Sequence, residues 1–196
     1  NSLNLTLYRN ITNSGTVDLS VDTLTFIGND QTIDGDITAT NILVNPTTGV
    51  TLSGSTDTVT ANNTLNIVNG NLSDNGHTIV VKGNLTNNAA HTSTGSGKIL
   101  LNGTSLQHIY GTGQFGSLEL DNATGANLES NIFLNNDFTL TNGIFNINSH
   151  LFALSENSLL NGSGFGTSKM IITNGSFGDA GMKKFVPGTN FNFVFP

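Results

Sequence analysis

The chain has 196 residues, of which only 10% are charged, and its 13 acidic and 6 basic side chains give a net charge of −7. This charge argues against binding to nucleic acid, which needs clustered Lys and Arg, and against electrostatic docking on anionic membranes. Cysteine is absent, so a disulfide framework and a thiolate metal site are excluded.

Asn, Thr, Ser and Gly take the place of the missing charges, and strong helix formers are scarce. This composition predicts short strands joined by polar turns and essentially no helix. Apolar runs stay below the roughly 18 residues of a transmembrane helix, so membrane insertion is not expected. Because the first residues read directly as alternating sequence without a signal peptide, we expect a mature fragment. Residues 191–196 (FNFVFP) stop within a strand pattern, so we expect that the fragment belongs to a longer protein.

The first third of the chain alternates apolar and polar residues, which is the pattern of half-buried strands. Turn residues follow at positions 13–15 (NSG) and 28–30 (GND). The apolar positions of these predicted strands are Leu3, Leu5, Leu7, Val17, Leu19, Val21, Leu24 and Phe26.

From Thr23 onward the sequence repeats itself at an offset of 76, and the copies keep both the alternation of apolar and polar residues and the turn residues. The matching pairs are Gln31 and Gln107, Ile33 and Ile109, Gly35 and Gly111, Ile42 and Leu118, Val44 and Leu120, and Leu52 and Leu128. The offset changes to 73 where residues 53–64 are matched by the shorter 129–137. A length change confined to a turn is what a stacked solenoid tolerates.

The clearest copy relates residues 65–81 (LNIVNGNLSDNGHTIVV) to residues 138–154 (FTLTNGIFNINSHLFAL). Its matching pairs are Leu65 and Phe138, Ile67 and Leu140, Leu72 and Phe145, Asn75 and Asn148, His77 and His150, Ile79 and Phe152, and Val81 and Leu154. Residues 98–103 (KILLNG) are echoed once more at 170–175 (MIITNG). The units therefore span approximately 23–97 and 98–169, with partial units at 1–22 and 170–196, in one domain covering 1–196.

A unit of about 75 residues accommodates about three coils of about 24 residues. The fold class predicted from this arithmetic is all-β, a right-handed parallel β-helix (solenoid) of about eight coils, in which inward residues form apolar ladders. The alternative is a tandem of antiparallel β-sandwich domains, because Asn-Gly between alternating runs also signals a hairpin. The solenoid is favoured because the partial units at both ends would leave sandwich domains incomplete, and because the turns recur without longer crossover loops. Tryptophan, the buried anchor common in immunoglobulin sandwiches, is also absent.

The run ILLNGTSLQHIYGTGQFGSLELDNATGANL, followed by FTLTNGIFNINSHLFAL, resembles repeats of large secreted surface proteins of the Bacteroidota. Residues 185–196 (FVPGTNFNFVFP) resemble the segment that closes such an array. The resemblance implies an adhesin-like or structural protein, exported across the outer membrane and carrying a separate sorting domain. The first copy departs from the pattern at residues 28–30, where Asn-Gly is expected.

His77 and His150 occupy the same place in the repeat, which suggests metal ligands. With three coils between them they would lie about 14 Å apart along the rod, and a shared zinc ion needs bonds of about 2 Å. We therefore expect a repeated turn or ladder position instead.

The densest acidic cluster is Asp30, Asp34 and Asp36. In a flat strand, Asp34 and Asp36 would point to the same side about 6.5 Å apart, near the separation of glycosidase carboxylates. The second copy has Tyr110 and Thr112 at these places, so solvated turn acids or weak calcium binding fit better than catalysis.

Outward threonine pairs suggest the hydroxyl array of an ice-binding solenoid, but residues 77–78 and 152–153 break the series. These pairs are Thr23 and Thr25, Thr58 and Thr60, and Thr139 and Thr141. Residues 95–98 (GSGK) lack the spacing of a phosphate loop, and no helix follows them, so a turn is predicted.

The leading prediction is a non-catalytic structural or adhesive segment of a secreted, extracellular repeat protein at the bacterial cell surface, with a role in cell adhesion. A polysaccharide-binding or polysaccharide-degrading β-helix is the first alternative, and an ice-binding solenoid the second. No catalytic, cofactor-binding or metal-binding residue is assigned, and no cofactor is expected. The expected partners are a glycan or other cell-surface ligand and neighbouring copies or domains of the same parent protein.

Overall fold

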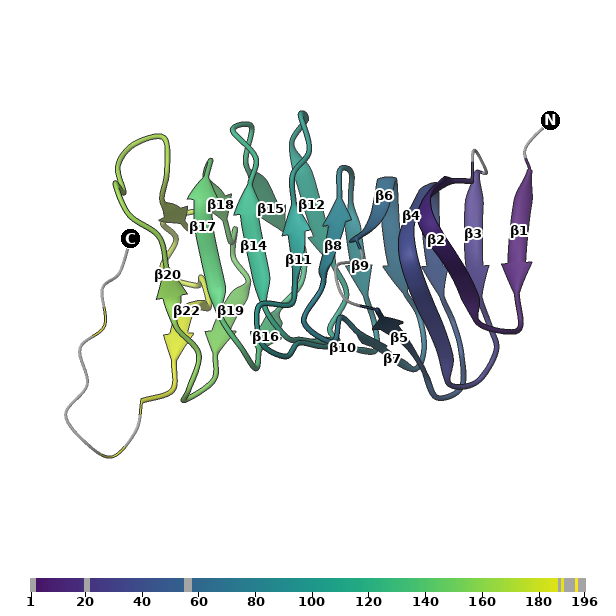
Figure 1. Ribbon diagram of the computed structural model, residues 1–196. Helices are drawn as coiled ribbons and strands as arrows, with labels where there is room; N and C mark the ends of the chain where they lie inside the picture. The colour runs from purple at the N-terminus through teal and green to yellow at the C-terminus, as the bar shows by residue number, and fades with distance from the viewer. Residues whose placement is uncertain (1–2, 20–21, 55–57, 187, 189–192, 194–196) are drawn as a thin grey trace.

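The chain folds into a rod of stacked strands, seen from the side in the computed structural model (Figure 1). The structure describes residues 3–19, 22–54, 58–186, 188 and 193. Within them lie 22 strands and no helix, from β1 (Asn4–Leu7) to β22 (Gly181–Lys184). The predicted β-solenoid of about eight coils is confirmed. Val21 and most of residues 191–196, also expected in strands, lie outside the described residues.

Each coil contributes strands to three faces, and each strand away from the ends of the rod pairs in parallel with the strands one coil before and one coil after it. Face 1 contains β1, β3 (Thr23–Phe26), the ends of β4 (Gln31–Val44) and β6 (Thr58–Ile67), β9 (Leu85–Asn87), β12 (Gln107–Tyr110), β15 (Ala126–Leu128), β18 (Phe145–Asn146) and β21 (Ile171–Ile172).

Face 2 contains the start of β2 (Ile11–Asp18), the start of β4, β5 (Gly49–Ser53), β7 (Asn71–Ser73), β10 (Ala90–Thr92), β13 (Gln114–Phe115), β16 (Ile132–Leu134), β19 (Leu151–Leu154) and β22. Face 3 contains the end of β2, the middle of β4, the start of β6, β8 (Thr78–Val81), β11 (Lys98–Leu101), β14 (Leu118–Asp121), β17 (Phe138–Asn142) and β20 (Leu160–Asn161). Because all these pairings are parallel, the alternative of antiparallel sandwiches is wrong.

Sequence alternation decides which side chains enter the rod, as the sequence predicts. Every second residue of a strand points inward, and parallel pairing places each inward residue over its equivalent in the next coil. One such ladder on face 1 joins Leu24, Ile42, Leu65, Leu85, Ile109 and Leu128, each at most 2% exposed. Burial of each aliphatic side chain contributes about 1.5–3 kcal/mol.

Positive-φ residues turn the chain at corners between faces. Gly35 (φ 98°) lies inside β4, where the chain passes from face 2 to face 3. Gly70 and Gly143 (φ 72° and 86°), which the hairpin alternative placed in tight turns, instead lead into strands parallel to those of the neighbouring coils. A left-handed backbone serves a solenoid corner as well as a hairpin, so the dipeptide Asn-Gly alone does not distinguish them.

The repeat unit does not correspond to a whole number of coils, and the expectation of three coils per unit is wrong. From Leu65, the ladder Leu85, Ile109 and Leu128 counts three full coils, and Phe138 then lies two faces further, on β17. The step from Leu65 to its copy Phe138 is therefore three and two-thirds coils. The copy relates positions on different faces, because the alternation that it preserves specifies inward pointing and not the face.

Near the C-terminal end, one coil shows how its three faces meet in the core. Phe138, Phe145 and Phe152 come from faces 3, 1 and 2, and their ring centroids lie 4.8–5.1 Å apart. All three rings are fully buried. Such edge-on and tilted pairs add about 0.5–1.5 kcal/mol each beyond their burial.

Candidate functional site

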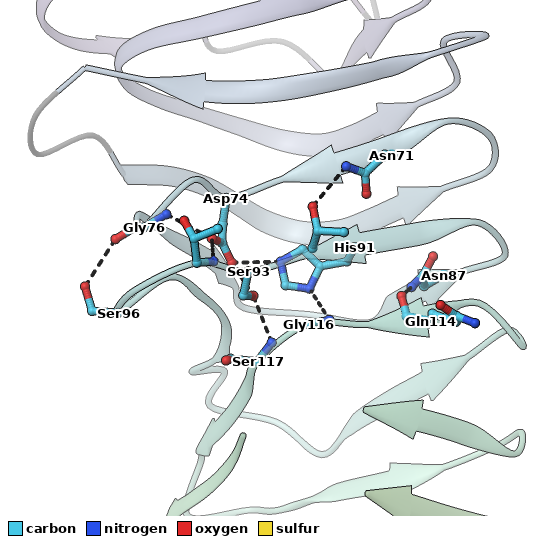
Figure 2. A network of polar contacts seen from close by, with 12 residues as sticks. Asn71, Asp74, Gly76, Asn87, His91, Ser93, Ser96, Gln114, Gly116 and Ser117 are labelled. Carbon is cyan, nitrogen blue, oxygen red and sulfur yellow. Dashed lines mark hydrogen bonds and ion pairs between the residues drawn. The ribbon is translucent and has the colours of Figure 1, made fainter. Parts of the chain in front are cut away.

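The most polar site inside the rod lies at the corner between faces 2 and 3, around Asp74 (Figure 2). Asp74 follows β7 and keeps the inward parity of Leu72, while His91 on β10 lies in register with Leu72 one coil later. Asp74 and His91 both have 0% exposure. Strand alternation therefore delivers a carboxylate and an imidazole to positions that apolar side chains occupy elsewhere in the ladders.

The carboxylate of Asp74 accepts four hydrogen bonds, two on each oxygen. Oδ1 accepts from the backbone N–H groups of Gly76 (3.0 Å) and Thr94 (3.3 Å). Oδ2 accepts from His91 Nε2 (3.1 Å) and from the hydroxyl of Ser93. A buried carboxylate is tolerated only when it is paired in this way.

The hydrogen bonds of His91 determine its tautomer. Nδ1 accepts from the backbone N–H of Gly116 (3.3 Å), so the ring proton is on Nε2 and points to Asp74. Ser93 donates its hydroxyl proton to Asp74, and its oxygen accepts from the backbone N–H of Ser117 (2.8 Å). The cluster thus ties together three successive coils, which contribute Asp74, His91 with Ser93, and residues 116–117.

The pKa of the Asp74 carboxyl reflects two opposed effects. Burial raises this pKa, but hydrogen bonds from His91, Ser93 and Gly76 to the charged form lower it more, and the pKa lies below its ordinary value. Asp74 is therefore ionised at neutral pH. The carboxylate fits because residue 97 is a glycine: a Cβ atom at this position would overlap Oδ1.

The arrangement of Asp74, His91 and Ser93 does not fit nucleophilic catalysis. In a serine triad the imidazole takes the serine proton, with the carboxylate on its other nitrogen. Here the Ser93 hydroxyl donates to the carboxylate, and the second imidazole nitrogen is occupied by a backbone N–H. With Asp74 and His91 sealed from solvent, the cluster joins coils and does not present a reactive group.

The two histidines of the repeat are turn residues, as expected. The backbone N–H of His77 donates to Asp74 O and that of His150 to Ile147 O, both at 2.9 Å. His77 lies between faces 2 and 3, whereas His150 lies between faces 1 and 2. They are three and two-thirds coils apart and on different corners, and not three coils apart on one corner.

The acidic cluster does not have the geometry of a flat strand. Asp34 ends the face 2 part of β4 and Asp36 begins the face 3 part, with the corner at Gly35 between them. Asp36 accepts from the backbone N–H of Thr58 (2.7 Å) and so fixes the start of β6. Within the described residues, no group of three or more His, Asp or Glu could hold a metal ion.

The remaining candidate motifs lie in ordinary strands and turns. Thr23 is in register with Asn4 and Asn41, and Thr60 with Thr38 and Val80, so the threonine pairs do not repeat from coil to coil. Residues 95–97 lie in the predicted turn, in which Gly97 N–H donates to Thr94 O at 2.9 Å, and Lys98 begins β11. The part of the chain that the structure describes contains no helix long and apolar enough to cross a membrane.

Buried glutamines explain another repeated position. Gln107 Nε2 donates to the carbonyls of Val81 and Gly83 in the preceding coil, and its Oε1 accepts from the backbone N–H of Gly103. Gln31, its partner in the repeat, makes the same kinds of bond to Leu7, Arg9 and Gly28. Both glutamines are 1% exposed. The repeat therefore carries a glutamine that joins its own turn to the coil before it.

Sequence reasoning missed the Asp74 cluster and the role of the glutamines. The available signal was the alternation of the sequence, which places Asp74, His91 and Ser93 on the inward side of the chain. The repeat at His77 and His150 drew attention to a turn position instead, because His91 has no histidine at the corresponding place of the second unit.

Two surface hollows lie on face 2. A polar hollow of about 460 Å³ is lined by Asp30, Gln31, Thr32, Thr48, Gly49, Thr51 and Asn71. A more apolar hollow of about 400 Å³ is lined by Thr112, Asn131, Ile132, Phe133, Leu151, Ala153, Lys183 and Phe185. Both are open to solvent, unlike the Asp74 cluster.

Comparison of the chain with protein-family models, with curated protein sequences and with solved structures finds no match.

Proposed function

We propose that the chain is a rigid, non-catalytic shaft within a secreted surface repeat protein of a bacterium, with a structural or adhesive role. The observation that carries this proposal is the continuity of the three parallel faces, which run from β1 to β22 across the described residues. Eight steps of about 4.8 Å between nine strands of face 1 give a rod about 38 Å long.

The interior supports the same role. Inward ladders are apolar over most of the rod, and its most polar site is internally hydrogen-bonded and closed to solvent. Buried polar groups that are fully paired specify one register, so the cluster around Asp74 holds neighbouring coils in place. A shaft needs such a register because slippage by one residue would turn every inward side chain outward.

The proposed location outside the cell, in a Bacteroidota surface protein, rests on the resemblance of the repeat and on the outer surface. Outward positions are mostly Asn, Thr and Ser, with few charges. These neutral groups suit contact with glycans and other hydroxyl-rich surfaces. Lysine and arginine are too few to suit contact with polyanions.

The shaft is tested by two measurements on the purified chain. Small-angle X-ray scattering should give an elongated particle whose length matches the coil count. Incubation with neutral and acidic polysaccharides should release no reducing or unsaturated ends. Depolymerisation that disappears in Asp34→Asn and Asp36→Asn would instead establish a polysaccharide-degrading enzyme.

Polysaccharide binding is the second candidate, favoured by the two open hollows on face 2. It differs from the enzyme hypothesis because it needs no acid or base at the ligand. It is compatible with an adhesive shaft, and retention on immobilised glycans would support it.

A further inference from the structure

The two hollows of face 2 belong to one outward row that runs along the rod. The residues of this axial row, each in register with the next, are Gly49, Asn71, Ala90, Gln114, Phe133, Ala153 and Lys183. Six steps of about 4.8 Å make the axial row about 29 Å long. The polar hollow contains Gly49 and Asn71, and the apolar hollow contains the last three residues of the axial row, Phe133, Ala153 and Lys183.

At the polar end, Asn71 presents an unmet acceptor. Its Nδ2 donates to Thr92 Oγ1 at 2.9 Å, while its Oδ1, although shielded from water, has no hydrogen-bond partner in the structure. Asp30 and the hydroxyls of Thr32 and Thr51 line the same hollow. A buried acceptor without a donor is costly, so a turn of the Asn71 amide toward the hollow that lets a ligand hydroxyl donate to Oδ1 would remove a penalty.

At the other end, aromatic surface is exposed. Phe133 and Phe185 pack edge to face with centroids 6.0 Å apart, and Phe185 is 42% exposed. Lys183 Nζ lies 4.4 Å from the centroid of the Phe185 ring. Ala153 lies between Phe133 and Lys183 in the axial row, and these three residues line the apolar hollow together with Phe185.

The chemistry of the axial row selects the kind of ligand. An added peptide strand finds no free ladder from β7 to β19 of face 2, because these strands already pair with the coils on both sides. A polyanion is disfavoured by the net charge of −7. A sugar chain provides hydroxyl donors for Asn71 and Asp30 and apolar C–H faces for Phe133 and Phe185.

We propose that the axial row of face 2 binds a linear, uncharged polysaccharide lying along the rod, with hydroxyls at Asn71 and sugar rings against Phe133 and Phe185. This inference rests on the proposed adhesive role and gives it a ligand class and a location. A ligand as long as the axial row spans several sugar units, so affinity grows with chain length until the axial row is filled.

The test uses the whole chain and linear oligosaccharides of glucose, mannose, xylose and N-acetylglucosamine, each with two and with six units. A glycan array followed by calorimetry should show at least one series in which the six-unit chain binds at least tenfold more tightly than the two-unit chain. The variants Asn71→Ala and Phe185→Ser should each weaken this binding at least fivefold. Thermal unfolding verifies that both variants remain folded.

Matched controls come from exposed aromatic residues away from face 2. Tyr110 on face 1 is 38% exposed and Phe177 is fully exposed, so Tyr110→Ser and Phe177→Ser should bind as the unchanged chain does. The inference is overturned if none of the series binds, or if the control variants lose as much affinity as the face 2 variants. If no glycan binds but scattering still shows a rod, the binding inference fails and the proposed shaft is retained. If a bound glycan is cleaved, only the proposal of a non-catalytic role fails.

Discussion

The substitution Asp74→Asn tests whether the buried cluster holds the rod together. Asparagine has nearly the shape of aspartate but replaces one acceptor oxygen with an NH₂ donor. If its NH₂ takes the place of Oδ2, it meets the Nε2–H of His91. If it takes the place of Oδ1, it meets the N–H groups of Gly76 and Thr94. His91 cannot resolve the conflict by changing tautomer, because its Nδ1–H would then face Gly116 N–H.

The expected cost follows from the number of conflicts. At least one buried donor loses its acceptor, which costs about 1–3 kcal/mol, and the remaining bonds lose their charge-assisted share of about 1 kcal/mol each. The easier burial of a neutral amide offsets part of this. We therefore expect the free energy of unfolding to fall by about 3 kcal/mol at pH 7.

Urea unfolding measures this loss, and an m value of about 1–3 kcal/mol/M converts it to a midpoint lower by about 1 M or more. Asp30→Asn is the matched control, because Asp30 is exposed and its positive φ of 50° suits Asn equally. It should shift stability by no more than about 0.5 kcal/mol. Equal effects of the two substitutions would refute the structural role assigned to the cluster.

Three other predictions follow from the same structure. The Asp74 carboxyl has a lowered pKa in the folded chain, so its stabilisation is complete above about pH 4, the unfolded value, and is lost as the pH falls through the folded pKa. The difference in urea midpoint between the unchanged chain and Asp74→Asn should therefore shrink below about pH 4, and a constant difference down to about pH 2 would contradict this. Gln107→Ala removes bonds to two carbonyls and an N–H, so we expect a loss of about 2–4 kcal/mol and faster amide exchange at Gly103; unchanged exchange would argue against it. Gly111→Ala places a Cβ against the carbonyl oxygen of Asn87 at a φ of 91° and should cost about 2 kcal/mol or more, while Gly15→Ala, with no atom within 4 Å of its Cβ, should be nearly neutral by thermal unfolding.

The fold class could be predicted because one local rule governs the whole rod. Alternation places Leu65, Ile67 and Leu72 inward, and a repeat of alternating runs and short turns indicates stacked coils, although the copies themselves lie on different faces. The coil length could not be predicted in the same way. Spacings between registered residues on face 1 range from 18, between Thr23 and Asn41, to 26, between Phe145 and Ile171, because corners absorb different numbers of residues without disturbing the ladders.

The candidate site depended on information that the sequence does not carry locally. Parity marks Asp74 and His91 as inward, but their pairing requires the register between two successive coils. A flat-strand picture likewise failed for Asp34 and Asp36, because Gly35 with its positive φ separates them onto two faces. In neither case does the strand pattern alone determine which polar groups meet.

The fractional repeat also controls how surface features are displayed around the rod. A copy displaced by three and two-thirds coils is rotated by two-thirds of a turn about the axis, so equivalent outward groups of successive units point in different directions. The step to the third copy is three and one-third coils, because residues 98–101 form β11 on face 3 and their echo includes β21 on face 1. After two steps the pattern is therefore back on the face of β3, seven coils or about 34 Å along the rod. Any binding surface encoded by the repeat would therefore alternate between two faces of the shaft and would not form one continuous stripe.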